Sequence, residues 1–93
     1  MSDAQRRTSI ARIMNKRGLH ARASAKIVEA AARFKSQITV SHDGHEVDAR
    51  SIMGLMMLAV SLGSDVEICA EGADSREALT AIVALIEAKF GEE

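Results

Sequence analysis

The regular alternation of polar and apolar residues from Asp65 to Glu71 limits how this chain can fold more than any other feature. Val66, Ile68 and Ala70 occupy every second position, and a strand places such residues on one face. The intervening Glu, Cys and Glu form the opposite, polar face. A sheet of such strands is covered on one face and solvated on the other, so its helices must share one side.

Three further strands are expected, and two of them are joined by a tight turn. Gln37–His42 alternates, and Asp43-Gly44 follows it as a hairpin signal, because glycine tolerates a positive φ. The chain then returns through Glu46–Ala49, which completes the hairpin. Thr8–Met14 is also predicted to be a strand, although its apolar residues alternate less regularly.

Three helices are expected beside these strands. Ala21–Phe34 spaces its apolar residues by three and four, which gives one helical face. Ser51 is expected to be the N-cap of a second helix over Ile52–Ser61. Asp74, followed by Glu77, resembles a capping box at the start of an amphipathic last helix. The elements therefore follow the order β-α-β-β-α-β-α.

This order predicts an α+β fold, an open-faced two-layer sandwich. A four-stranded antiparallel sheet would carry all three helices on one face. With 93 residues the chain is long enough for one domain and too short for two. We expect a disordered polar tail over residues 1–7 and a single domain over residues 8–93.

Composition excludes several classes of function. The formal net charge is −1 and the chain has neither Trp nor Tyr, which argues against a nucleic-acid partner. No apolar run approaches the roughly 18 residues of a membrane span, and no apolar signal core begins the chain, so a cytoplasmic location is expected. Cys69 is the single cysteine, which rules out an internal disulfide. We expect no cofactor and no metal site.

His20 stands out because of its neighbours. Gly18 and a basic cluster precede it, and a helix is expected to begin directly after it at Ala21. The imidazole would therefore lie beside the unpaired N–H groups of a helix N-terminus, which attract phosphate. Arg22 can add charge-assisted hydrogen bonds. The chain contains neither of the common glycine-rich nucleotide-binding loops, so a histidine that receives its phosphoryl group from another protein is expected.

The string Gly-Leu-His-Ala-Arg at residues 18–22 resembles the active-site signature of HPr, the histidine-containing phosphocarrier of the bacterial phosphoenolpyruvate phosphotransferase system. A second block, Ser-Ile-Met-Gly-Leu-Met at residues 51–56, also matches. The resemblance extends over residues 8–90, and the predicted order of elements is that of the HPr family. Sugar uptake and the parallel nitrogen-regulatory branch use the same histidine chemistry, so the resemblance leaves both open.

The resemblance implies roles for individual residues. His20 would receive the phosphoryl group, on the ring nitrogen nearer the backbone, from Enzyme I and pass it to an Enzyme IIA-type acceptor. Arg22 and the backbone at Ala21 and Ala23 would hold the phosphoryl group. Ser51 matches a serine that a dedicated kinase phosphorylates in some bacteria. Such a protein is a carrier and not an enzyme, and its site should be shallow and exposed.

One departure from the family concerns the residue three positions after His20. The family usually has proline where this chain has Ala23. Proline is favourable in the first turn of a helix, because its missing N–H would be unpaired there anyway. Alanine should therefore lower local rigidity and add an N–H donor near the phosphoryl group, while the nucleophile remains.

A second expected surface lies on the helix after Ser51. Ile52, Met53 and Met56 share one face, and methionine suits a surface that accepts several partners. Arg17 and Lys26 would add positive charge around it. Four apolar residues on another face of the same segment are assigned to the core: Leu55, Leu58, Ala59 and Leu62.

Two other functions remain open from the sequence. A regulatory module of ferredoxin-like type that binds a small molecule also places helices on one face of an antiparallel sheet. A pure interaction domain would act through Ile52, Met53 and Met56 alone. The phosphocarrier hypothesis is preferred, and with it a monomer that binds Enzyme I, Enzyme IIA-type acceptors and a serine kinase.

Overall fold

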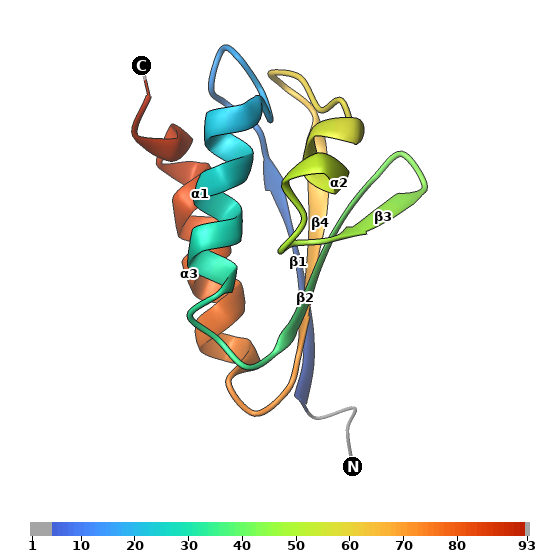
Figure 1. Cartoon of the computed structure of the whole chain (residues 1–93), viewed down its shortest axis with the longest axis vertical. Coiled ribbons are helices and arrows are strands. Elements are labelled where there is room, and N and C mark those ends of the chain that lie inside the picture. The colour runs from blue at the N-terminus through green and yellow to red at the C-terminus, as the bar shows by residue number, and fades with distance from the viewer. Residues whose placement is uncertain (1–4, 93) are drawn as a thin grey trace.

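A sheet covered by helices on one face organises the computed structural model, which describes residues 5–92 (Figure 1). The elements follow the predicted order: β1 (Arg6–Arg12), α1 (Ala21–Ala31), β2 (Gln37–His42), β3 (His45–Asp48), α2 (Ile52–Met57), β4 (Asp65–Glu71), α3 (Ser75–Glu87) and the short 3-10 helix η2 (Lys89–Gly91). The α1 and α3 helices lie side by side, and α3 packs on β1 and β4. No helix within residues 5–92 is long and apolar enough to cross a bilayer.

The strand order is β1-β4-β2-β3, and every neighbouring pair is antiparallel. The β4 strand, one of the two interior strands, pairs along its whole length with β1, from Arg6 opposite Glu71 to Arg12 opposite Asp65. The alternation predicted for β4 is confirmed, since Val66, Ile68 and Ala70 are buried. The open-faced two-layer sandwich is therefore the fold of this protein.

The prediction of a disordered tail over residues 1–7 was wrong for residues 6 and 7. Arg6 and Arg7 belong to β1 and pair with Glu71 and Ala70 of β4. Backbone pairing with an interior strand that extends to Glu71 orders these residues, although their side chains are polar. The first four residues lie outside the described part of the chain.

The second helix is shorter than Ile52–Ser61, and this changes which residues reach the core. The chain leaves the helix at Leu58, and Ala59 takes a left-handed conformation with φ 54°. Leu55 and Leu58 are buried as predicted, but Ala59 is exposed and Leu62 is 50% exposed. A shared helical face requires a continuous helix, and the turn at Ala59 removes Leu62 from that face.

Asp74 is the N-cap of α3, but the predicted capping box is wrong. Its side chain makes no hydrogen bond to the helix. The carboxylate instead accepts the backbone N–H groups of Lys35 and Ser36, each at 2.9 Å, and the Ser36 hydroxyl at 2.5 Å. These bonds, the one from the Ser36 hydroxyl most of all, lower the pKa of Asp74. Asp74 thereby ties the loop between α1 and β2 to the start of α3.

We expect this contact to make the protein sensitive to acid. The pKa of Asp74 is lower in the folded protein than its ordinary value of 3.8, so the ionised carboxylate stabilises the fold. This stabilisation is fully present above pH 3.8 and is lost as the pH falls through the lowered pKa. Urea unfolding between pH 6 and pH 3 should therefore show a smaller acid-induced loss in Asp74→Asn than in the wild type. Equal losses in the two proteins would contradict this assignment.

Candidate functional site

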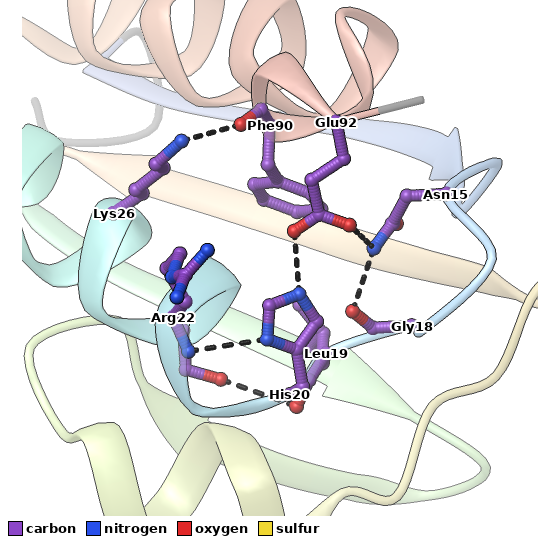
Figure 2. A network of polar contacts seen from close by, with 9 residues as sticks. Asn15, Gly18, Leu19, His20, Arg22, Lys26, Phe90 and Glu92 are labelled. Atoms are coloured by element: carbon purple, nitrogen blue, oxygen red, sulfur yellow. Dashed lines mark hydrogen bonds and ion pairs between the residues drawn. The ribbon is translucent and has the colours of Figure 1, made fainter.

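His20 is the N-cap of α1, and the helix begins at Ala21 as the sequence predicted. Its carbonyl accepts the first helical hydrogen bond from the Ser24 N–H at 2.9 Å. Its ring nitrogen Nδ1 accepts the Arg22 N–H at 3.2 Å (Figure 2). Because the Arg22 N–H can only donate, Nδ1 carries a lone pair and no proton. The ring nitrogen nearer the backbone is thus the one with nucleophilic character.

The loop before His20 is fixed by the loop after α2. The Leu19 N–H donates to the Val60 carbonyl at 3.1 Å, and the Leu19 side chain is buried. Gly18 has φ 65°, and a Cβ atom at this position would lie 2.3 Å from the Val60 oxygen. Only glycine fits this left-handed position against a neighbouring backbone. The imidazole therefore projects from a fixed support.

The segment after α3 folds back over the His20 ring. Lys89, Phe90 and Gly91 all have positive φ, between 56° and 77°, which reverses the chain direction. The Phe90 side chain is buried, and its carbonyl accepts a hydrogen bond from Lys26 Nζ at 2.5 Å. Figure 2 shows how this reversal brings Glu92 to the imidazole.

Glu92 joins His20 and Asn15. Its Oε2 atom lies 2.5 Å from His20 Nε2, and its Oε1 atom accepts a hydrogen bond from Asn15 Nδ2 at 3.0 Å. Asn15 Nδ2 also donates to the Gly18 carbonyl at 2.8 Å, so one amide group holds the loop and the carboxylate together. This contact leaves the His20 side chain only 15% exposed, so the expectation of an open, exposed histidine was wrong.

Positive charge surrounds the carboxylate of Glu92. Partial burial by itself raises the pKa of Glu92, but hydrogen bonds from His20 and Asn15 and the charge of Arg17 outweigh this and lower it. Lys16, Arg17 and Arg22 line a hollow of about 280 Å³ together with Glu92. The site thus combines an imidazole with three cationic side chains, a setting suited to a phosphoryl group.

The other residues predicted for phosphate binding lie in the first turn of α1. Ala21, Arg22 and Ala23 are its first three residues, whose N–H groups have no carbonyl to bind within the helix. Ala23 is fully buried, backbone included, whereas Ala21 and Arg22 are exposed. Lys26 lies one turn further along, where it holds the Phe90 carbonyl. The structure therefore gives Lys26 a part in the fold that the sequence did not indicate.

The predicted second surface is present on α2. Ile52, Met53 and Met56 are all exposed, Met53 by 70%, and the sequence missed Met57, which is equally open. Ser51 caps the helix as predicted, and its Oγ atom accepts the Gly54 N–H at 2.9 Å. The α2 helix contacts α1 and leads into the loop that holds Leu19. The apolar surface and His20 therefore belong to neighbouring parts of the molecule.

Comparison with known proteins gives the same assignment. Residues 8–88 match the family model described as "PTS HPr component phosphorylation site". The phosphocarrier protein HPr of Cupriavidus necator is 54% identical over 80 residues, which cover 86% of this chain and 90% of that protein. The crystal structure of HPr-C-His from Thermoanaerobacter tengcongensis is 52% identical and superimposes with a TM-score of 0.89, covering 94% of this chain and 98% of that one.

Fold and site together define a small domain that carries a phosphoryl group between other proteins. The chain belongs to the HPr family, the phosphocarrier proteins of the bacterial phosphotransferase system. It is a component of that system and not itself an enzyme, and the alternative of a small-molecule-binding ferredoxin-like module is not supported. An HPr dimer from T. tengcongensis, 55% identical with a TM-score of 0.75 over 86% of this chain and 92% of that one, leaves the expected monomer unconfirmed.

Proposed function

We propose that His20 Nδ1 is the atom that accepts the phosphoryl group from phosphorylated Enzyme I. The observation that carries the proposal is the hydrogen bond from the Arg22 N–H to Nδ1, because it keeps a lone pair on this nitrogen. In the transfer, that lone pair forms the new bond to phosphorus while the bond from phosphorus to Enzyme I breaks. The electron pair of the broken bond stays with Enzyme I.

The start of α1 then supplies what the product needs. The Arg22 N–H, released from Nδ1, and the N–H of the exposed Ala21 become donors to the phosphoryl oxygens, while the N–H of the buried Ala23 adds to the positive end of the helix. The helix dipole and the Arg22 guanidinium stabilise the added negative charge. Phosphoryl transfer depends mainly on positioning and charge stabilisation, and both are present at this helix terminus.

The site is tested by locating the phosphoryl group. The protein is incubated with Enzyme I and phosphoenolpyruvate, and the labelled peptide is identified under alkaline conditions, where phosphohistidine survives. We expect one acid-labile, base-stable adduct, on His20. An adduct confined to another residue would overturn the proposal.

We further propose that Ile52, Met53 and Met56 form the docking surface for Enzyme I and for an Enzyme IIA-type acceptor. Their exposure supports this role, since apolar side chains on a small domain are more often covered. Arg17 lines the hollow beside Arg22, whereas Lys26 lies between α1 and α3 with its Nζ atom on the Phe90 carbonyl. Both would add positive charge that attracts acidic partners. The protein would act in the cytoplasm as a monomer, with this surface open to each partner in turn.

Met53→Glu should weaken docking without weakening the fold. Met53 is 70% exposed, so the substitution leaves the core unchanged, but a charge in the centre of an apolar contact should raise the KM for Enzyme I about tenfold. Ile10→Glu is the matched control, because Ile10 is also an exposed apolar residue but lies on β1. Equal KM values for Met53→Glu and the wild type would refute the docking surface.

Ser51 is proposed as a regulatory phosphorylation site for a serine kinase. Its Oγ atom lies at the start of α2, directly before Ile52 and Met53, and a phosphate there would be accepted by the helix N-terminus. The same phosphate would place about two negative charges beside the docking surface. Modification of Ser51 should therefore reduce phosphorylation of His20 by Enzyme I.

A further inference from the structure

We propose that Glu92 is a positioning residue for phosphoryl transfer, whose carboxylate holds a proton on His20 Nε2 and thereby leaves Nδ1 as the nucleophile. This inference rests on the proposed function of His20. Nothing in the sequence around His20 points to Glu92, which lies 72 residues away and reaches the ring only through the folded chain.

Two independent contacts require the same tautomer of His20. An ionised carboxylate can only accept hydrogen bonds, so the 2.5 Å contact between Glu92 Oε2 and Nε2 places the hydrogen on Nε2. On the other side of the ring, Nδ1 accepts the Arg22 N–H. The ring is thus held between a donor and an acceptor, which fixes both its tautomer and its orientation.

Glu92 also faces the charge that forms during transfer. When Nδ1 bonds to phosphorus, its lone pair is consumed and the imidazole becomes positively charged until it releases the phosphoryl group. The Nε2 proton stays between Nε2 and Oε2 throughout, so no proton has to leave or enter. A carboxylate at this distance stabilises the charged ring, as the carboxylate of a catalytic triad does.

The surrounding structure is arranged to hold this carboxylate in place. Asn15 is fully buried and gives both hydrogens of its amide to oxygen atoms, those of Gly18 and Glu92. Its own Oδ1 atom is buried with no hydrogen-bond partner among the described residues. If the Asn15 amide were rotated by 180°, its oxygen would face the Gly18 carbonyl and the Glu92 carboxylate, and neither would receive a hydrogen bond. The two donated bonds therefore determine the orientation of the amide. Phe90, buried in a left-handed conformation, fixes the chain just before Glu92.

The alternative is that Glu92 blocks the site. It lies among Lys16, Arg17 and Arg22 and is an anion where a phosphoryl group has to bind. Its contact, however, is with Nε2 and not with Nδ1, so the nitrogen that receives phosphorus remains uncovered by it. The geometry therefore favours positioning, and blocking becomes an outcome that the test distinguishes.

The tautomer is measured without Enzyme I, by ¹⁵N NMR of the His20 ring at a pH where the ring is neutral. We expect the proton on Nε2 in the wild type and a mixture of both tautomers in Glu92→Ala. Glu92→Gln has one acceptor oxygen left, which can accept the Nε2 hydrogen only if the bond from Asn15 is given up, so it should favour the wild-type tautomer less strongly than Glu92 does. An unchanged tautomer in Glu92→Ala would overturn the inference.

The rate is measured in a single turnover with phosphorylated Enzyme I. Glu92→Ala should be slower by about tenfold, the lower end of what losing the carboxylate partner of a metal-bound histidine costs. Glu92→Gln should lie between Glu92→Ala and the wild type, since it orients the ring but lacks the charge. Glu87→Gln, an exposed glutamate at the end of α3, is the matched control and should behave as wild type.

The outcomes separate the two proposals. A faster Glu92→Ala protein would identify the carboxylate as a blocking group and overturn the positioning role. Absence of an adduct on His20 in the wild type would overturn the proposed function, whatever the NMR result. The NMR shift together with the slower transfer, in a Glu92→Ala protein that unfolds at the wild-type urea concentration, would support the inference.

Discussion

His20→Ala should accept no phosphoryl group from Enzyme I under conditions that label the wild type completely. Alanine removes the nucleophilic nitrogen, and the N–H groups of α1 can hold a phosphoryl group but cannot form a bond to it. The substitution also removes the N-cap of α1 and the partner of Glu92, which should cost about 1 kcal/mol of stability. Gel shift or intact mass after incubation with Enzyme I and phosphoenolpyruvate measures the labelling.

The control for this experiment is His45→Ala. His45 is an exposed histidine at the start of β3, next to the hairpin turn, and should be dispensable. The variant should be labelled as fully as the wild type. Urea unfolding of both variants shows whether each is folded at the assay temperature. Labelling of a folded His20→Ala protein would mean that the phosphoryl group resides elsewhere.

Gly18→Ala should be the most destabilising single change in the loop that carries His20. The new Cβ would lie 2.3 Å from the Val60 carbonyl oxygen, a distance that requires the two loops to separate. Alanine must also adopt φ 65°. The left-handed conformation and the overlap together should cost roughly 2–4 kcal/mol. Because the Leu19–Val60 hydrogen bond would be strained, His20 should also be displaced and labelled more slowly.

Gly44→Ala is the comparison that separates the cost of the left-handed backbone from the cost of steric overlap with a neighbouring loop. Gly44 has φ 82° in the hairpin turn, but a Cβ there would meet nothing within 4 Å. This variant should lose only about 1 kcal/mol, the cost of the left-handed conformation alone. Urea unfolding of both variants gives the comparison. Similar losses for Gly18→Ala and Gly44→Ala would show that the contact with Val60 is unimportant.

The fold was largely predictable because its signals are local and periodic. The alternation in β4, the Asp43-Gly44 turn and the apolar spacing of α1 each occupy a few consecutive residues. The error at the end of α2 arose because a left-handed residue ended the helix without a sequence signal. Ala59 is that residue, and alanine is no indicator of a positive φ.

The site was predictable only in part, for the same reason. His20 and Arg22 are neighbours in the chain, so one motif revealed both. Glu92 and Asn15 contact each other across 77 residues, and no spacing rule connects them. The contact between Glu92 and Asn15 depends on the chain reversal at Lys89 and Phe90, two non-glycine residues with positive φ. Tertiary packing of Phe90 stabilises this turn, and local sequence patterns do not report such packing.

The shared position of the α2 surface and the start of α1 has a kinetic consequence. The α2 helix contacts α1, so if the donor and the acceptor of the phosphoryl group dock on α2 as proposed, both would cover the same small area (Figure 1). The two partners would then exclude each other, and the protein would have to leave one before it meets the next. The rate at which phosphoryl groups pass from donor to acceptor then depends on short residence times in each complex. Weak complexes with fast dissociation provide such short residence times. A substitution that tightened binding to Enzyme I would therefore slow phosphoryl transfer, as would one that abolished this binding.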